Sequence, residues 1–298
     1  MYRFKQVWQV AFFNFRQWKN NPRVAITFVL AFIMCMMLSD KAISFANSYG
    51  TTMQIMEAFV WTFGDASSIM ISSLLLVLLF SDMPFITAVT PYYLSRTKKS
   101  VWMWGQVVYV ILATILYVLF LLLITVALCA HISFAGNMWS ETGALLGYSG
   151  IGIKVALPAS VKTMEMSLPY QCAAWIFLLV LLYSLLTVTL MMVFNMKKSS
   201  FMGILSVFIL NLYGLLLNPQ IFVTLFNLPQ SLQYKANVVT GWLSPLNHAT
   251  YYMHNFGYDY LPRLGMSCIL FLIFILLHIF MIWKSIKKYE FNFLQIND

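Results

Sequence analysis

Residues 107–131 read VVYVILATILYVLFLLLITVALCAH, twenty-five consecutive positions without aspartate, glutamate, lysine or arginine. A helix of about 20 apolar residues is long enough to cross the hydrocarbon core of a bilayer. This stretch is also too long for a strand or for an ordinary buried helix. It therefore predicts a transmembrane helix.

The composition of the whole chain agrees with this prediction. The 298 residues are 61% hydrophobic and only 9% charged, whereas soluble domains carry about 25% charged residues. A soluble globular protein is excluded, and the sequence predicts an all-α, polytopic membrane protein with a single transmembrane domain over residues 1–298. We expect six transmembrane helices, at about residues 22–38, 56–80, 107–131, 172–194, 201–217 and 261–283.

The basic residues indicate how these spans are oriented. Thirteen of the eighteen lie on one proposed side, and only Lys41, Lys154, Lys162, Lys235 and Arg263 lie on the other. Cytoplasmic loops carry the excess of lysine and arginine, so we expect a cell-membrane protein with both termini in the cytoplasm. The basic residues border apolar runs instead of gathering on one domain, which makes nucleic acid an improbable partner despite the net charge of +9. The thirteen are Arg3, Lys5, Arg16, Lys19, Arg23, Arg96, Lys98, Lys99, Lys197, Lys198, Lys284, Lys287 and Lys288.

Residues 1–20 precede the first span and predict an amphipathic helix. Its apolar stripe consists of Phe4, Val7, Trp8, Ala11, Phe15 and Trp18. Such a helix can lie in the headgroup plane, with its basic residues near anionic lipid. The sequence leaves two roles open, a simple anchor and an anchor that also contacts a cytoplasmic partner.

Two long polar segments are expected to be extracellular. Residues 132–168 contain several glycines but no lysine with the spacing of a phosphate-binding loop, so we expect short helices, partly re-entrant. Residues 218–260 contain apolar pieces too short to span, interrupted by Pro219, Pro229 and Pro245. That pattern favours half-helices that dip into the outer leaflet and form an outer gate.

Two carboxylates fall in the outer half of the second span. Glu57 and Asp65 are candidates for a transport pathway, because carboxylates at membrane depth tend to face a cavity or a partner helix. For Asp65 a place at a helix end, in the headgroup region, is the favoured alternative.

Enzymatic chemistry has little support in the sequence. The best group is His248, His254 and Asp259, but the histidines are six positions apart in the sequence, which is the wrong spacing for two metal ligands on one helical face. The four cysteines show no metal-binding spacing, and we expect buried free thiols, with a disulfide between Cys129 and Cys172 left open. No metal or other cofactor is expected on this chain.

The loop at residues 81–106, SDMPFITAVTPYYLSRTKKSVWMWGQ, carries the basic residues Arg96, Lys98 and Lys99 between two spans. The charge distribution predicts that it is cytoplasmic. The spans have few charged residues near their centres, where ion-coupled transporters bind substrate and ion. A transporter of this composition would therefore take its energy from outside the chain.

This arrangement resembles the permease subunits of type-two ATP-binding-cassette exporters. The resemblance covers nearly the whole chain and is architectural: a basic N-terminal helix, six spans and a broken outer segment with Trp242, Ser244 and Pro245 before the last span. In that family the first inner loop commonly ends in Leu-Ser-Arg followed by basic residues. Residues 94–99 of this chain, LSRTKK, match that pattern. The family loop often has several acidic residues and a Gly-Thr before that point, whereas here Asp82 is the single acidic residue and Pro84, Phe85 and Ile86 fill the place.

The resemblance implies a mechanism. It places a short coupling helix around Phe85–Tyr93 in a groove of a separate ATPase, which binds ATP and Mg²⁺. Two permeases, copies or paralogues, would pair and move an amphipathic or hydrophobic cargo (a drug, an antimicrobial peptide or a lipid) outward, and this chain itself would not be an enzyme. The coupling residues so implied are Pro84, Phe85, Ile86, Thr87, Pro91, Tyr92, Tyr93, Arg96, Lys98 and Lys99.

Two other classes of function stay open from the sequence. One is an intramembrane enzyme acting on lipid or peptide, which would require His248, His254 or Asp259. The other is a channel or immunity-type membrane protein that works without ATP. The sequence does not distinguish among cargoes.

Overall fold

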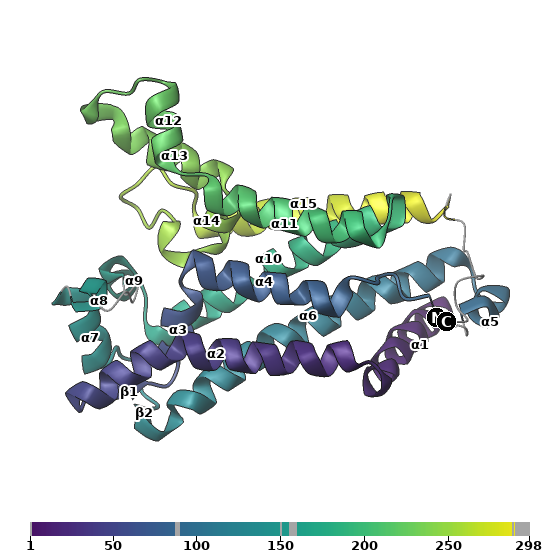
Figure 1. Cartoon of the computed structure of the whole chain (residues 1–298), viewed down its shortest axis with the longest axis horizontal. Coiled ribbons are helices and arrows are strands. Elements are labelled where there is room, and N and C mark those ends of the chain that lie inside the picture. The colour runs from purple at the N-terminus through teal and green to yellow at the C-terminus, as the bar shows by residue number, and fades with distance from the viewer. Residues whose placement is uncertain (1, 87–89, 150, 155–159, 288, 290–298) are drawn as a thin grey trace.

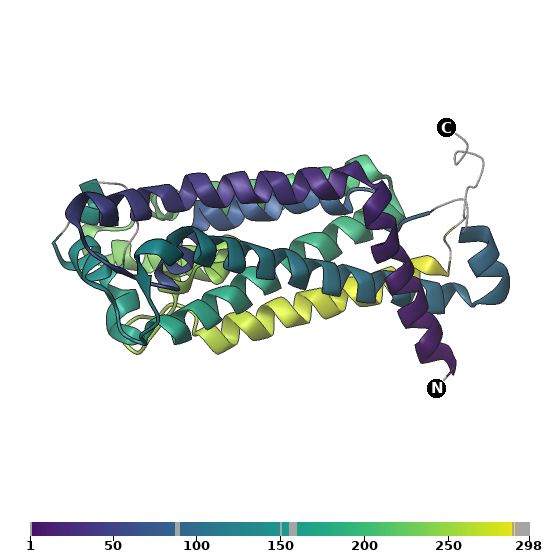
Figure 2. The same cartoon turned by 90° about the horizontal axis from the view of Figure 1, so that it is seen from below.

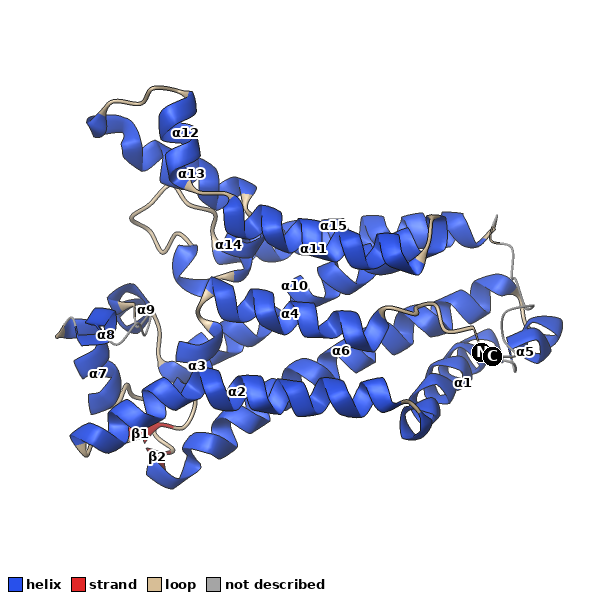
Figure 3. Cartoon of the chain, viewed as in Figure 1, coloured by secondary structure: helices blue, strands red, loops and turns tan. Residues whose placement is uncertain are grey.

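The computed structural model describes residues 2–86, 90–149, 151–154, 160–287 and 289. About 81% of it is helical, which confirms the all-α class. The long helices run side by side in one bundle, and short helices gather at its two ends (Figures 1 and 3). Within the described ranges the extended structure is one parallel pair of two-residue strands, β1 (Met53–Gln54) and β2 (Ser133–Phe134).

Four helices are long and apolar enough to cross a membrane, and two bent helix pairs meet the same test. The apolar stretches that the sequence predicts as spans are largely helical, and the four to six candidate spans in the described part of the chain indicate a membrane protein. The four are α2 (Pro22–Tyr49), α6 (Lys99–Cys129, extended by the 3₁₀ turn η2, Ala130–Ile132), α10 (Pro169–Lys197) and α15 (Leu264–Ile286). The pairs are α3 (Glu57–Phe63) with α4 (Ala66–Phe80), bent by 84°, and α11 (Ser200–Leu216) with α12 (Pro219–Leu225), bent by 68°.

Helix α2 is eleven residues longer than the span predicted at residues 22–38. The buried stripe continues through Ser39, Ala42 and Phe45, and the Ser39 hydroxyl donates to the Cys35 carbonyl at 2.6 Å. The helix therefore continues beyond the predicted span, although the polar residue Ser39 follows directly after it. The helix ends at Gly50, whose φ of 64° is a left-handed conformation that favours glycine.

The second predicted span, residues 56–80, is not one continuous helix, because it breaks between α3 and α4. The Asp65 carboxylate accepts the backbone N–H groups of Ser67 at 3.0 Å and Ser68 at 3.3 Å. It is the N-cap of α4, and an N-cap starts a new helix direction. The aspartate is thus placed at a helix end, the alternative favoured from the sequence.

Helix α10 is the centre of the bundle and packs against α3, α4, α6, α11 and α15. Its buried hydroxyls at Thr187 and Thr189 donate to carbonyls one turn earlier, at 2.8 Å each. Asn211 of α11 accepts from Tyr183 at 3.0 Å and from Ser73 of α4 at 2.9 Å. Polar contacts between helices in an apolar bundle fix their relative positions.

The bundle has two distinct ends, here named the α5 end and the α7 end (Figure 1). At the α5 end lie α1, α5 and the C-terminal turns of α10 and α15, and Figure 2 shows α1 crossing this end at a steep angle. The α7 end carries the short helices predicted for residues 132–168 and 218–260. The α5 end has α1 (Tyr2–Arg16), the 3₁₀ turn η1 (Gln17–Asn20) and α5 (Thr90–Arg96). The α7 end has α7 (Glu141–Tyr148), α8 (Ile151–Lys154), α9 (Val161–Met166), η3 (Gln230–Leu232), α13 (Gln233–Leu243), α14 (Pro245–Ala249) and η4 (Tyr251–Met253).

All four cysteines are free thiols. Cys35, Cys129 and Cys172 are buried, as expected, and Cys268 is partly exposed. The Cys129 thiol lies 3.4 Å from the Ile55 carbonyl. No disulfide joins Cys129 to Cys172 in this structure.

Candidate functional site: the α5 end

Helix α1 is docked firmly on the first half of α6. Gly105 makes this possible, because a Cβ atom at that position would lie 2.5 Å from the Val10 Cβ. One turn along α1, the Asn14 amide donates to the Gln106 side chain at 2.8 Å, and both side chains are buried. The amphipathic helix is confirmed, but its buried face includes Val10 and Asn14, which the predicted apolar stripe omits.

An aromatic cluster around Tyr109 joins four parts of this end. The Trp18 indole N–H donates to the Tyr109 hydroxyl at 2.7 Å. The rings of Phe15, Phe80 and Phe85 lie 4.9, 6.2 and 5.6 Å from the Tyr109 ring, each edge-on. Such edge-to-face contacts add to the free energy of burial. Helix α1, η1, the end of α4 and the following loop therefore converge on one residue of α6.

The first residues of the predicted coupling loop are fixed to the bundle. Arg23 of α2 forms an ion pair with Asp82, and its guanidinium also donates to the Ser81 hydroxyl at 3.4 Å. Asn195 of α10 donates to the carbonyls of Ser81 and Met83, at 2.9 and 2.8 Å. The loop begins from a base that α2 and α10 hold in place.

The short helix of this loop lies later in the chain than predicted. The expectation was Phe85–Tyr93, but α5 covers Thr90–Arg96. Phe85 and Ile86 are not helical and pack partly buried against the core, which pulls residues 84–86 toward the bundle. Pro91 lies in the first turn of α5, where proline is tolerated because the N–H it lacks has no helical partner. Thr87 lies outside the described residues, as does the side chain of Tyr93.

Helix α5 presents an exposed aromatic and basic face. The Tyr92 side chain is 73% exposed, and Arg96, four residues later, is exposed on the same face. Lys98 and Lys99 are also exposed, at the start of α6, and the Lys99 amine donates to the Tyr289 carbonyl at 3.2 Å. Exposed tyrosine and arginine are the residue types enriched at protein interfaces. Helix α5 therefore has the composition of a docking surface, and Figure 1 shows it beyond the ends of the long helices.

The two pathway candidates have structural partners. Glu57 is fully buried, and its carboxylate accepts the Ser140 backbone N–H at 2.7 Å and the Ser140 hydroxyl at 2.5 Å. It therefore ties α3 to the start of α7. Asp65 caps α4, as described above. The transport role of these carboxylates stays a prediction.

The two histidines of the enzyme alternative meet at a serine that the sequence did not point to. The Ser267 hydroxyl lies 2.7 Å from His248 Nδ1 and 2.8 Å from His254 Nε2. The other ring nitrogens donate to the carbonyls of Trp242 and Tyr251, at 3.0 Å each. Ser267 is fully buried, whereas His248 also lines a cavity beside α10 and α15. Asp259 is not part of it and pairs with Lys162 at 2.5 Å.

Acidification is expected to destabilise the α7 end. Burial lowers the pKa of His254 to about 4 and also lowers the pKa of His248, with the nearby positive charge of Lys162 acting in the same direction on His254. In the unfolded state the imidazoles are protonated as the pH falls below about 6.5, whereas in the folded state they stay neutral to a lower pH. The unfolded state therefore binds more protons, and the free energy of unfolding falls as the pH drops from about 6.5 to about 4. The thermal midpoint of the purified protein measures this fall. His254→Gln should flatten the dependence on pH, and an unchanged dependence would contradict the assignment.

No known protein family, curated protein or solved structure matches this chain.

Proposed function

We propose that this protein is the permease subunit of an ATP-driven exporter and that α5 receives force from a separate ATPase. The observation that carries the proposal is the exposed face of Tyr92 and Arg96 on a helix next to a rigid base. That base is built by Arg23, Asn195 and the cluster around Tyr109. A flexible connector would need none of these contacts.

A push on α5 has short routes into the bundle. Helix α6 begins three residues after α5 ends, so movement of one is transmitted directly to the other. On the other side, the loop carbonyls bonded to Asn195 lead into α10, the central helix. In this proposal the ATPase binds ATP and Mg²⁺, and its closure moves α5 together with α6 and α10.

The topology that fits this proposal has six spans, with the α5 end in the cytoplasm. The bent pairs α3–α4 and α11–α12 are then each one broken span. Two such chains pair, as copies or paralogues, and an amphipathic or hydrophobic cargo leaves toward the α7 end. In this proposal the protein is located in the cell membrane.

Loss of the α5 face should separate the permease from its ATPase. The double variant Tyr92→Ala and Arg96→Ala removes the two exposed contacts and leaves the contacts of Arg23, Asn195 and Tyr109 in place. Tyrosine and arginine at an interface centre each contribute about 2 kcal/mol or more, so recovery of the ATPase should fall at least tenfold. The measurement is co-purification, from native membranes, of a soluble protein with a phosphate-binding loop, together with the ATP hydrolysis it brings.

Tyr258→Ala is the matched control, because Tyr258 is 78% exposed and lies between η4 of the α7 end and the start of α15. It should leave recovery unchanged. Equal recovery in the α5 variant and the control would sink the proposal. So would a wild-type preparation that hydrolyses lipid or peptide without any ATPase.

A further inference from the structure

Three cavities follow one face of α10, and all three lie beside α11 or α15. Helices α11 and α15 both pack extensively on α10 and make little contact with each other. The cavity at the α5 end has a volume of about 880 Å³ and lies between α10 and α15. The middle one, of about 420 Å³, lies between α10 and α11, and the third, of about 480 Å³, continues toward the α7 end.

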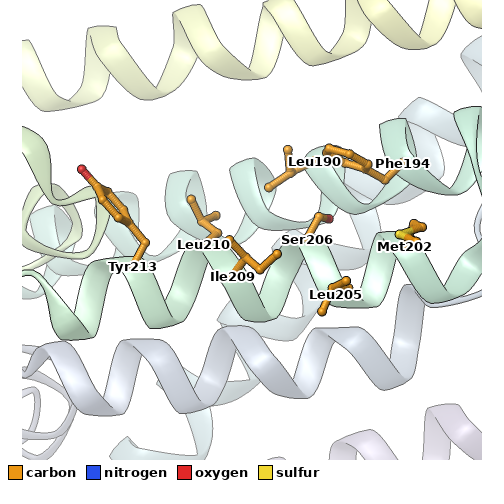
Figure 4. Close-up of a pocket in the computed structure, with 8 residues that line it drawn as sticks. All are labelled: Leu190, Phe194, Met202, Leu205, Ser206, Ile209, Leu210 and Tyr213. Carbon is orange, nitrogen blue, oxygen red and sulfur yellow. The ribbon is translucent and has the colours of Figure 1, made fainter.

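The three cavities lie in succession along one face of α10, and together they are named the tract. Leu186, Leu190, Phe194 and Lys197 line them in turn along α10, at helical spacings of four, four and three residues. Leu190 and Leu210 line both the middle and the third cavity. Figure 4 shows Leu190 and Phe194 of α10 facing the row of side chains on α11 that ends at Tyr213.

The middle cavity and the cavity at the α5 end differ in the chemistry of their lining. The middle cavity is lined by leucine, isoleucine, methionine and aromatic side chains, with Ser206 and the Tyr213 hydroxyl as its polar groups. The cavity at the α5 end is lined by three amines, Lys197, Lys198 and Lys284. None of the three amines has a carboxylate within 4.0 Å in the described part of the chain. Lys287 does not line this cavity. Its Nζ lies 4.2 Å from the centroid of the Trp283 ring.

The dimensions match one leaflet of a bilayer. From Leu186 to Lys197 the α10 face rises by about 17 Å, at about 1.5 Å per residue. Half of the hydrocarbon core is about 15 Å thick. If α10 spans the membrane, the amines lie at the headgroup level and the apolar cavities lie at acyl-chain depth.

We propose that this tract is a binding site for an anionic phospholipid, with its phosphate at Lys197, Lys198 and Lys284 and an acyl chain between α10 and α11. Lysines at the ends of spans also set orientation and complement helix C-termini. Those roles do not explain why three lysines line the same cavity, or why apolar cavities lie next to it along α10. The proposal is independent of the ATP-driven transport proposed above.

Lipid preference tests the site directly. The full-length protein in detergent is titrated with phosphatidylglycerol, phosphatidylcholine or inorganic phosphate, and bound lipid is counted by native mass spectrometry together with the thermal midpoint. Wild-type protein should bind phosphatidylglycerol at least about tenfold more tightly than phosphatidylcholine, because each lysine near an anionic headgroup contributes about 1 kcal/mol. The variant K197Q/K198Q/K284Q should lose this preference.

Two further variants distinguish a bound lipid from a general effect of positive charge. K5Q/K19Q/K41Q removes the same number of charges elsewhere and should keep the preference. Ile209→Trp fills the middle cavity, which Ile209 lines, and should weaken phosphatidylglycerol binding while the lysines remain. The proposal would be overturned if the wild type bound both lipids equally, or if the K5Q/K19Q/K41Q control lost the preference as fully as K197Q/K198Q/K284Q. It would also be overturned if Ile209→Trp bound phosphatidylglycerol as tightly as the wild type, or if inorganic phosphate stabilised the protein as much as phosphatidylglycerol does.

Discussion

Replacing Gly105 with leucine is expected to release α1 from α6. The first added carbon would lie 2.5 Å from the Val10 Cβ and 3.1 Å from the Val7 carbonyl oxygen. Neither atom is the free end of a flexible chain, so the helix itself has to move. Overpacking of this kind costs about 1–3 kcal/mol, and separation also breaks the buried bond between Asn14 and Gln106.

Trypsin gives the readout for this change. Arg16 and Lys19 lie at the end of α1 and in η1, and their cleavage should accelerate about tenfold or more when the local opening free energy falls by about 1.4 kcal/mol or more. Gly265→Leu is the control, because a Cβ atom at Gly265 has no neighbour within 4 Å. Similar cleavage rates in the two variants would contradict the close packing of α1.

Replacing Glu57 with alanine is expected to destabilise the whole α7 end. The change removes the acceptor of both the Ser140 N–H and the Ser140 hydroxyl in a fully buried site. A buried donor left unpaired costs about 1–3 kcal/mol, and bonds to a carboxylate are among the stronger ones. We therefore expect a loss of about 3 kcal/mol in the free energy of unfolding, measured with denaturant in detergent.

Two variants test whether the hydrogen bonds cause this loss. Glu57→Gln keeps one oxygen that can accept the Ser140 N–H, and its amide can donate to the Ser140 hydroxyl, so the loss should be less than half as large. Glu141→Gln changes an exposed carboxylate one residue after Ser140 and should have little effect. If Glu57→Ala behaved like Glu141→Gln, the proposed tie between α3 and α7 would be wrong.

The sequence predicts the helices of this fold well because hydrophobicity is a local property. All six apolar stretches are helical, and the short helices of residues 132–168 and 218–260 are present. The break at Asp65 was missed because an N-cap depends on one side chain bonding to Ser67 and Ser68. The number of apolar residues in a stretch gives no information about such a hydrogen bond. The extension of α2 was missed because Ser39 is polar in composition but buried in the structure.

The candidate sites show the same division between local and tertiary information. The basic loop was found from its charges, but α5 is shifted because Phe85 packs against Tyr109, a contact between residues 24 positions apart. The meeting of His248 and His254 at Ser267 brings α14 and the residue that follows η4 together on α15. The lysine cavity joins Lys197 to Lys284. Spacing in the sequence carries no signal for any of these contacts.

The bend between α3 and α4 also has a consequence for the order of biosynthesis. All seven residues of α3 are buried, and the helix packs on α2, α6 and α10. Helix α10 begins at Pro169, about a hundred residues after α3 ends, which corresponds to roughly 5–20 s of translation. During that interval α3 lacks one of the three long helices on which it packs. We therefore expect residues 56–80 to enter the membrane without the bend, and the bend to form only after α10 arrives.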